Sequence, residues 1–297
     1  IRDSRVTEFR RVLFRSAKRI KDTEDTIKFF ENAGRNDKEV EIRYASQVKG
    51  LYNGLKNMQG KLEGFEKYDL VAKKAAQEKE LLDWINADPA RAKKYGSVAA
   101  DLAAFQVRQK AFGARTELLN GVLGGSVIMS QAYTIIRTVP EIQKPDKDRE
   151  LGYQERNLLQ LKQRIQLAER GYVFATDRDL LKWTLARLRA AHPDTAKWPA
   201  ALQGLAAGSD ADVAARVDGM YARTILADPK KRVELLGLKP AALAAVPDPF
   251  LQLAADMEKE LKVVREESKA LGREGADLKM AYEAAILEMK KGTYPPD

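Results

Sequence analysis

Two asparagines, Asn53 and Asn57, are the polar residues whose type and spacing say most about possible chemistry. A spacing of four residues places both side-chain amides on one face of a helix, where they offer hydrogen bonds. Gly54 and Gly60 fall in the same stretch, and both Asn and Gly are unfavourable inside helices. This departure from helix propensity favours either a functional surface or tight packing, and the residues alone do not separate the two.

The chain offers little for nucleophilic or acid–base catalysis. His192 is the only histidine, and Pro193 follows it directly. A His-based triad needs an imidazole oriented beside a nucleophile, and no plausible partner lies near His192. A helix-terminal residue near an exposed turn is the favoured interpretation. The chain has no cysteine, which excludes disulfides and thiol catalysis. We therefore predict no catalytic residue in this chain.

Carboxylates gather at two places, Glu266-Glu267 and the pair Asp210 and Asp212. A metal site needs His, Cys or carboxylate side chains at ligand spacing, which neither group has. We interpret both groups as solvated helix faces. The sequence predicts no metal site and no cofactor.

Glycines and short basic runs also lack the context of a binding motif. Gly121, Gly124 and Gly125 lie in an apolar stretch without the strand and the lysine of a phosphate-binding loop, so close helix packing or a kink is favoured. The basic runs 73–74 and 230–232 are short and are followed by acids. We interpret these runs as solvated helix faces and predict no nucleic-acid site.

The elements that would position these residues are helices. Charged residues make up 32% of the chain and aromatic residues only 7%, and good helix formers dominate. Gly34 followed by Asn36-Asp37 predicts a break between two amphipathic helices before Pro89. Three later helices are predicted to begin at Asp-Pro pairs, at 88–89, 228–229 and 248–249. Helical periodicity covers residues 69–86, 97–109, 117–139, 153–170, 177–191 and 249–291.

Strand signals are almost absent, and the expected loops are residues 140–148, 192–199 and 204–212. No stretch approaches eighteen uncharged apolar residues, so we expect no membrane-spanning segment. The length of 297 residues is ample for a hydrophobic core. The sequence predicts an all-α fold, a single elongated helical domain.

Residues 1–16 stand apart from the rest of the chain. The run 8–16 resembles a translated sequencing-library adapter, and we predict a foreign segment over 1–16 and the helical domain over 17–297. The alternative is a short basic amphipathic segment that binds a membrane or nucleic acid. Without residues 1–16, the formal net charge of +9 falls to a modest +6.

Five blocks in order resemble the helical domain of the family 46 serine peptidases, the bacterial dipeptidyl aminopeptidases. The first joins residues 42–46 to the run with Asn53 and Asn57, which ends at Gly64. The second is 84–96, with its Ala-Asp-Pro junction, and the third is 148–156. The entry and exit of the last helix, 248–250 and 294–297, complete the set.

This resemblance implies a cap inserted in a chymotrypsin-like double β-barrel that is absent here. In the family, the barrel carries a His-Asp-Ser triad, and the cap helps restrict cleavage to dipeptides released from a free N-terminus. An Asn of the cap is thought to contact the substrate's α-amino group, and the candidates here are Asn53 and Asn57. The resemblance also implies an exported, periplasmic and commonly homodimeric enzyme. We expect this fragment, without a triad, to be inactive alone.

A different class of protein also fits the helical pattern. A free-standing helical adaptor, assembled through its long terminal helix, has the same composition and periodicity. The two readings differ in what flanks the chain at its native locus, because a cap runs straight into barrel strands and an adaptor does not.

Overall fold

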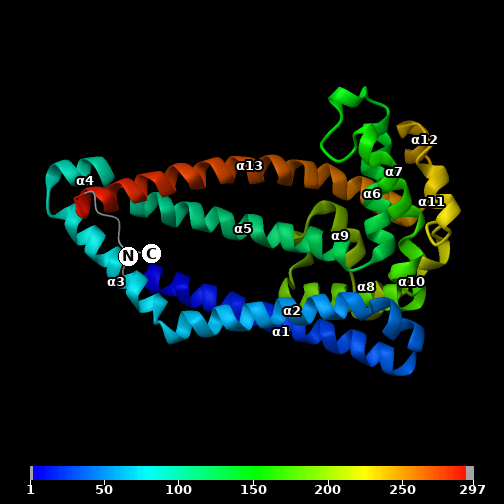
Figure 1. Cartoon of the computed structure of the whole chain (residues 1–297), viewed down its shortest axis with the longest axis horizontal. Coiled ribbons are helices and arrows are strands. Elements are labelled where there is room, and N and C mark those ends of the chain that lie inside the picture. Colours follow the sequence, from blue (N-terminus) through cyan, green and yellow to red (C-terminus); the bar gives the residue numbers. More distant parts are fainter. Residues whose placement is uncertain (1–2, 292–297) are drawn as a thin grey trace. The chain divides into compact units, whose positions relative to one another are not determined.

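The computed structural model describes residues 3–291, and it describes their side chains from residue 17 onward except at position 71. This part of the chain consists of helices joined by loops and contains no strand, which confirms the all-α prediction (Figure 1). The α-helices are α1 (Asp3–Asn36), α2 (Lys38–Lys67), α3 (Leu70–Asn86), α4 (Pro89–Tyr95), α5 (Val98–Gly124), α6 (Val127–Ile142), α7 (Glu155–Gln166), α8 (Phe174–Ala191), α9 (Ala200–Ala206), α10 (Asp210–Arg223), α11 (Pro229–Leu235), α12 (Pro240–Ala244) and α13 (Pro249–Met289). Short 3-10 helices are η1 (Asp146–Asp148), η2 (Ala168–Gly171) and η3 (Thr195–Lys197).

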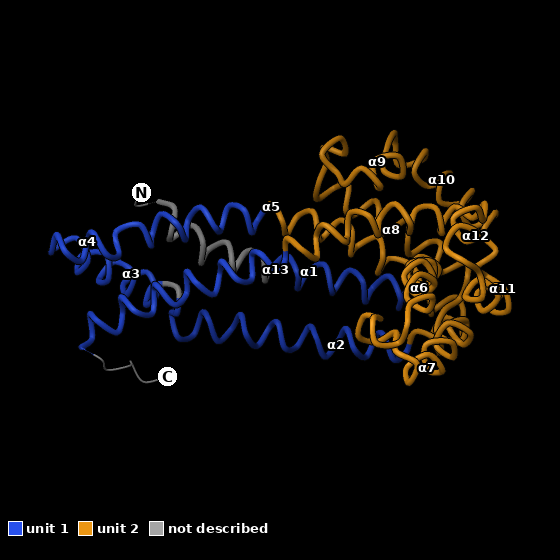
Figure 2. Tube along the Cα trace, turned by 90° about the horizontal axis from the view of Figure 1, so that it is seen from above, with its two compact units in different colours: residues 1–32, 45–110, 268–297 blue, residues 33–44, 111–267 orange. Residues whose placement is uncertain are grey.

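The helices belong to two compact units, coloured separately in Figure 2, a division that the sequence analysis does not anticipate. Unit 1 holds the chain up to residue 32, residues 45–110 and the chain from 268 onward. Unit 2 holds residues 33–44 and 111–267. No described helix is both long and apolar enough to cross a membrane.

The predicted helix starts are confirmed at all three Asp-Pro pairs. Asp88, Asp228 and Asp248 each accept a hydrogen bond from the backbone nitrogen two residues further on, at 2.8, 2.8 and 2.9 Å. The break after α1 is confirmed too, because Asp37 accepts from the nitrogen of Glu39 at 2.8 Å. These carboxylates satisfy amides of the first helical turn, which have no intrahelical partner.

The prediction of one helix over 117–139 is wrong, because α5 ends at Gly124 and α6 begins at Val127. Ser126 closes the gap as the N-cap of α6 and accepts from the nitrogen of Met129 at 3.0 Å. A Cβ on Gly125 would lie 2.9 Å from Cγ2 of Thr184, so the glycine lets α8 approach the break. The interpretation of this Gly-rich stretch as a kink with close packing is confirmed.

Loop boundaries also differ from the prediction. The α6 helix continues through Pro140 to Ile142, and the expected loop at 204–212 contains the end of α9 and the beginning of α10. Ser209 and Asp212 form a capping box at the start of α10, in which each side chain binds the other's backbone nitrogen.

Each unit has its own core. In unit 1, the ends of α3, α4 and α13 meet. At the edge of that core, the carboxylate of Glu288 accepts hydrogen bonds from Lys94 and from Tyr95, at 2.7 Å each. The buried residues of this cluster are Leu81, Ile85, Tyr95, Val98 and Ala285. In unit 2, fully buried side chains include Leu119, Ile128, Met129, Ile135, Leu181, Leu185, Val217 and Phe250.

Candidate functional site

The helix α2 carries both asparagines of the sequence analysis on its exposed side. Asn53 and Asn57 are exposed, whereas Val40, Tyr44 and Leu55 of the same helix are buried. At 100° per residue, the two asparagines lie about 40° apart around the helix. Neither side chain has a hydrogen-bond partner among the described residues, so both amides are free to bind something else.

The glycines of α2 have no packing explanation within the described structure. A Cβ added at Gly50, Gly54 or Gly60 would find no atom within 4 Å. Each glycine costs a helix about 1 kcal/mol relative to alanine. Tight packing was the second explanation for glycines in this helix, and it is therefore wrong for these three positions. The exposed side of α2 is a polar surface over which another backbone can approach closely.

The helix α1 holds the edge of this surface in place within unit 1. The hydroxyl of Tyr52 donates to Glu31 at 2.5 Å, and the amide of Gln59 lies 3.5 Å from Glu24. The hydrogen bond to Glu31 raises the pKa of Tyr52. These contacts use the residues beside the asparagines and leave the asparagines themselves open.

The first part of α2 is anchored in unit 2. Arg43 donates to the backbone carbonyls of Glu169 and Tyr172, the latter at 3.2 Å. Tyr44 is 1% exposed, and burial raises its pKa. These contacts hold residues 43 and 44 in place within unit 2.

Arg232 supports the same carbonyl-bearing segment from α11. Its guanidinium is fully buried and donates to the carbonyls of Ile165 at 2.9 Å and Leu226 at 2.8 Å, and to Glu169 at 2.6 Å. The prediction that run 230–232 is a solvated face is therefore wrong for Arg232. An amphipathic spacing cannot reveal this, because the carbonyl of Ile165 and the carboxylate of Glu169 lie 67 and 63 residues away in the sequence.

His192 ends α8, as predicted. Its backbone nitrogen donates to Leu188 at 2.8 Å, its carbonyl accepts from the indole of Trp198 at 2.8 Å, and its ring nitrogen Nε2 lies 3.5 Å from Glu117. Imidazole and carboxylate without a nucleophile beside them do not form a triad. The structure thus gives His192 a role in closing the helix.

The carboxylate groups singled out earlier already have structural roles. Asp212 belongs to the capping box of α10, Asp210 pairs with Arg189, and Glu267 pairs with Arg115. No group of three potential ligands was found among the described residues.

A buried polar cluster escaped the sequence analysis. Asp177 is 0% exposed and accepts from the nitrogens of Val127 at 2.6 Å and Ile128 at 3.2 Å, from Ser126 at 2.8 Å and from Tyr221 at 2.6 Å. Burial raises the pKa of this carboxyl, and the four donors oppose that rise. Because every oxygen is directed at the start of α6, the cluster holds a helix end and leaves no group free for catalysis.

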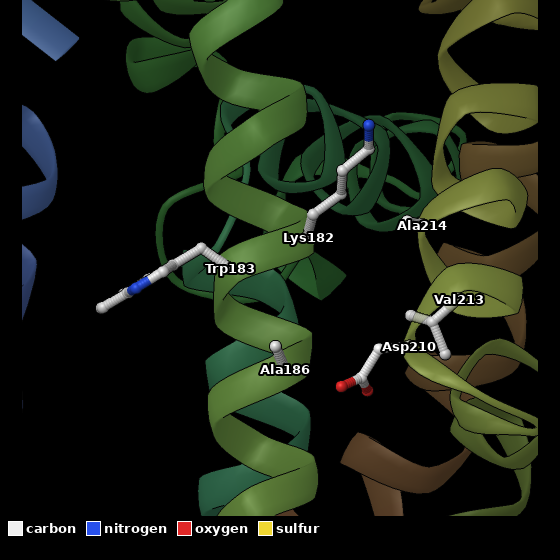
Figure 3. Close-up of a pocket in the computed structure, with 6 residues that line it drawn as sticks. All are labelled: Lys182, Trp183, Ala186, Asp210, Val213 and Ala214. Atoms are coloured by element: carbon white, nitrogen blue, oxygen red, sulfur yellow. The ribbon is translucent and has the colours of Figure 1, made fainter.

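A shallow pocket lies between α8 and α10 (Figure 3). It has a volume of about 240 Å³, and Lys182 and Asp210 are its charged residues. Both charges are neutralised locally, since Lys182 lies 2.6 Å from Asp218 and Asp210 pairs with Arg189. The side chain of Trp183 points away from Asp210. The free amides of α2 therefore make the better candidate site.

Comparisons with known proteins agree with the resemblance seen in the sequence. The family model of peptidase S46 matches residues 5–297. The chain belongs to the peptidase S46 family. The match begins inside the stretch 1–16, whose foreign origin stays a prediction.

One relative is an Asp/Glu-specific dipeptidyl-peptidase of Shewanella putrefaciens, 26% identical over 264 residues, which are 89% of this chain and 35% of that protein. The crystal structure of Porphyromonas endodontalis DPP11 matches with a TM-score of 0.64 and 22% identity, over 92% of this chain and 38% of that one. The same protein in complex with the dipeptide Arg-Glu matches with a TM-score of 0.62 and 21% identity, over 93% of this chain and 38% of that one. The chain thus spans little more than a third of the length of the relatives it matches.

Proposed function

We propose that this chain is the helical cap of a serine-type dipeptidyl aminopeptidase, in which α2 binds the N-terminus of the peptide substrate. Family membership and a relative named as a dipeptidyl-peptidase support the reaction class. The observation that carries the binding role is the pair of unpartnered amides, Asn53 and Asn57, on an open helix face.

The chemistry of the site suits an ammonium group. An amide oxygen accepts hydrogen bonds, and a substrate N-terminus offers three N–H donors. An anchor fixed on a rigid helix sets which peptide bond reaches the catalytic residues, so it limits the product to a dipeptide. Asn53 and Asn57 are equivalent candidates for this contact.

We assign hydrolysis to the part of the complete enzyme that corresponds to the remaining length of the relatives, outside the region that this chain matches. We place the His-Asp-Ser triad there, on the double β-barrel, and we expect this chain alone to be inactive. The barrel is then the first partner of the cap, a homodimer of the complete enzyme is the expected assembly, and the periplasm is the expected compartment.

Substitution in the complete enzyme tests the anchor. We expect Asn53→Ala or Asn57→Ala to lower kcat/KM for unblocked peptides by about 5- to 150-fold, the equivalent of about 1–3 kcal/mol for one lost buried hydrogen-bond partner. Gln47→Ala, an exposed amide on the same helix, is the matched control and should change nothing. Equal kinetics for both asparagine variants and the wild type would remove the assignment.

A further inference from the structure

The exposed side of α2 that carries the asparagines is also strongly basic. From residue 42 to residue 62 the chain has no Asp or Glu but carries Arg43, Lys49, Lys56 and Lys61. Acids flank this run on both sides, at Glu41 and Glu63. Shorter acid-free runs with three basic residues each occur at 102–116, 156–168 and 180–193, so among such basic runs the one in α2 stands out by its length.

The three lysines of this run are exposed, and none of them forms an ion pair with a described residue. Some other lysines form such pairs, since Lys231 lies 2.7 Å from Glu234 and Lys182 lies 2.6 Å from Asp218, whereas exposed lysines such as Lys110 and Lys162 form none with described residues. Two acids of α1, Glu31 and Glu24, contact the run at Tyr52 and Gln59 and not at its lysines. A positive potential is therefore left over this face.

The spacing ties the lysines to the asparagines. Lys49 precedes Asn53 by four residues and Lys61 follows Asn57 by four, so each amide has a lysine one turn away, and Lys56 lies between them. With a rise of 1.5 Å per residue, Lys61 lies about 12 Å along the helix from Asn53, and Lys49 lies about 12 Å from Asn57. An extended peptide covers about 12 Å in three to four residues.

Whichever asparagine holds the N-terminus, a lysine thus lies at the distance of the third or fourth substrate residue. The same lysines repel the substrate's own ammonium group, so a neutral or basic peptide gains nothing from them. A carboxylate placed after the dipeptide offsets this repulsion, because the lysines attract it over roughly one Debye length.

We propose that Lys49, Lys56 and Lys61 form a subsite for acidic side chains at the third and fourth substrate positions, beyond the dipeptide that is released. The proposal rests on the proposed function. The subsite raises the local concentration of peptides with anionic residues there and speeds their capture. It acts independently of the pocket that selects the side chain at the cleaved bond.

A peptide series in the complete enzyme tests the subsite. All peptides share the first two residues that the enzyme cleaves best, and they carry Glu-Glu, Gln-Gln or Lys-Lys at positions three and four. At low salt we expect kcat/KM to be about fivefold higher for Glu-Glu than for Gln-Gln and lowest for Lys-Lys. In 0.5 M NaCl these differences should largely disappear.

Two matched triple variants identify the residues responsible. Replacing Lys49, Lys56 and Lys61 by Gln should abolish the preference for Glu-Glu at low salt. The control triple replaces three exposed lysines elsewhere, Lys110, Lys162 and Lys230, by Gln, and it changes the net charge equally. The control should keep the preference.

Equal rates for Glu-Glu and Gln-Gln at low salt, or an undiminished preference in the Lys49/Lys56/Lys61 variant, would overturn the subsite. N-acetylated copies of the same peptides separate this failure from that of the proposed function. If acetylation abolishes cleavage while charge has no effect, the N-terminal anchor stands and only the subsite is wrong. If acetylated peptides are cleaved as fast as free ones, the anchor is wrong and the subsite is lost with it.

Discussion

The cap of α6 can be broken at one residue, Asp177, whose carboxylate gathers four hydrogen-bond donors at a buried helix start. In Asp177→Ala, the hydroxyls of Ser126 and Tyr221 can still pair with each other, since they lie 2.8 Å apart. The backbone nitrogens of Val127 and Ile128 have no such replacement.

The magnitude follows from these two amides. Each buried donor left without a partner costs about 1–3 kcal/mol, and the space of the lost carboxylate adds to that. We expect Asp177→Ala to lower the free energy of unfolding of unit 2 by about 4 kcal/mol, a large part of the 5–15 kcal/mol typical of a domain. Asp177→Asn keeps one acceptor oxygen for the amides and should cost about half as much.

Chemical denaturation measures this loss, and the tryptophans report on the units separately. Trp84 belongs to unit 1, whereas Trp183 and Trp198 belong to unit 2. In a Trp84→Phe background, tryptophan fluorescence therefore follows unit 2 alone. The control is Asp218→Asn, an acid of the same unit that is half-exposed and paired with Lys182, and exposed pairs contribute at most about 1 kcal/mol.

A small loss of stability in Asp177→Ala would contradict this role of the carboxylate. If Asp177→Ala costs no more than Asp218→Asn, the carboxylate does not hold the start of α6 in solution. If Asp177→Asn, which keeps the volume of the side chain, cost as much as Asp177→Ala, the one acceptor oxygen that Asn retains would contribute nothing to holding the amides.

Two further predictions concern a glycine pair and a titrating carboxylate. Gly60→Ala should stabilise the chain by about 0.4–1 kcal/mol, because the added Cβ meets no atom. Gly125→Ala should destabilise the chain, because the added Cβ would lie 2.9 Å from Thr184. Thermal denaturation should therefore show a higher Tm for the first variant and a lower Tm for the second. The hydrogen bonds from Lys94 and from Tyr95 hold the pKa of Glu288 below its ordinary value of 4.5. The stabilisation from Glu288 is therefore present above pH 4.5 and is lost as the pH falls through the lowered pKa. Glu288→Gln should lower the Tm at pH 7, and this loss should shrink as the pH falls below 4.5 and the carboxylate is protonated. A loss that stays constant over that range would contradict the linkage.

Local signals in the sequence were sufficient where the partner of a residue lies within one helical turn. Asp88, Asp228 and Asp248 each bind amides two residues away, so the dipeptide Asp-Pro contains the whole interaction. The shared helix face of Asn53 and Asn57 follows from spacing in the same way, whereas its exposure is known only from the structure.

The rest depends on contacts between segments far apart in the chain. Ser126 and Asp177 are 51 positions apart, and Arg232 binds a carbonyl 67 positions away. No periodicity encodes such pairs, so the break between α5 and α6 and the burial of Arg232 appear only in the fold. The openness around the α2 glycines is a property of three-dimensional surroundings as well.

Glycines within the helices of this chain fall into two groups. Gly121 and Gly275 allow close approach, because a Cβ would lie 3.0 Å from Leu188 and from Phe105 respectively. Their conformational cost is offset by packing against those side chains. Gly50 and Gly60 occupy a helix with the same propensity cost and meet nothing. Gly113, Gly219 and Gly272 in other helices meet nothing either. What distinguishes α2 is that two asparagines without described partners lie beside such glycines, and in the proposed function a substrate peptide supplies the contacts for both.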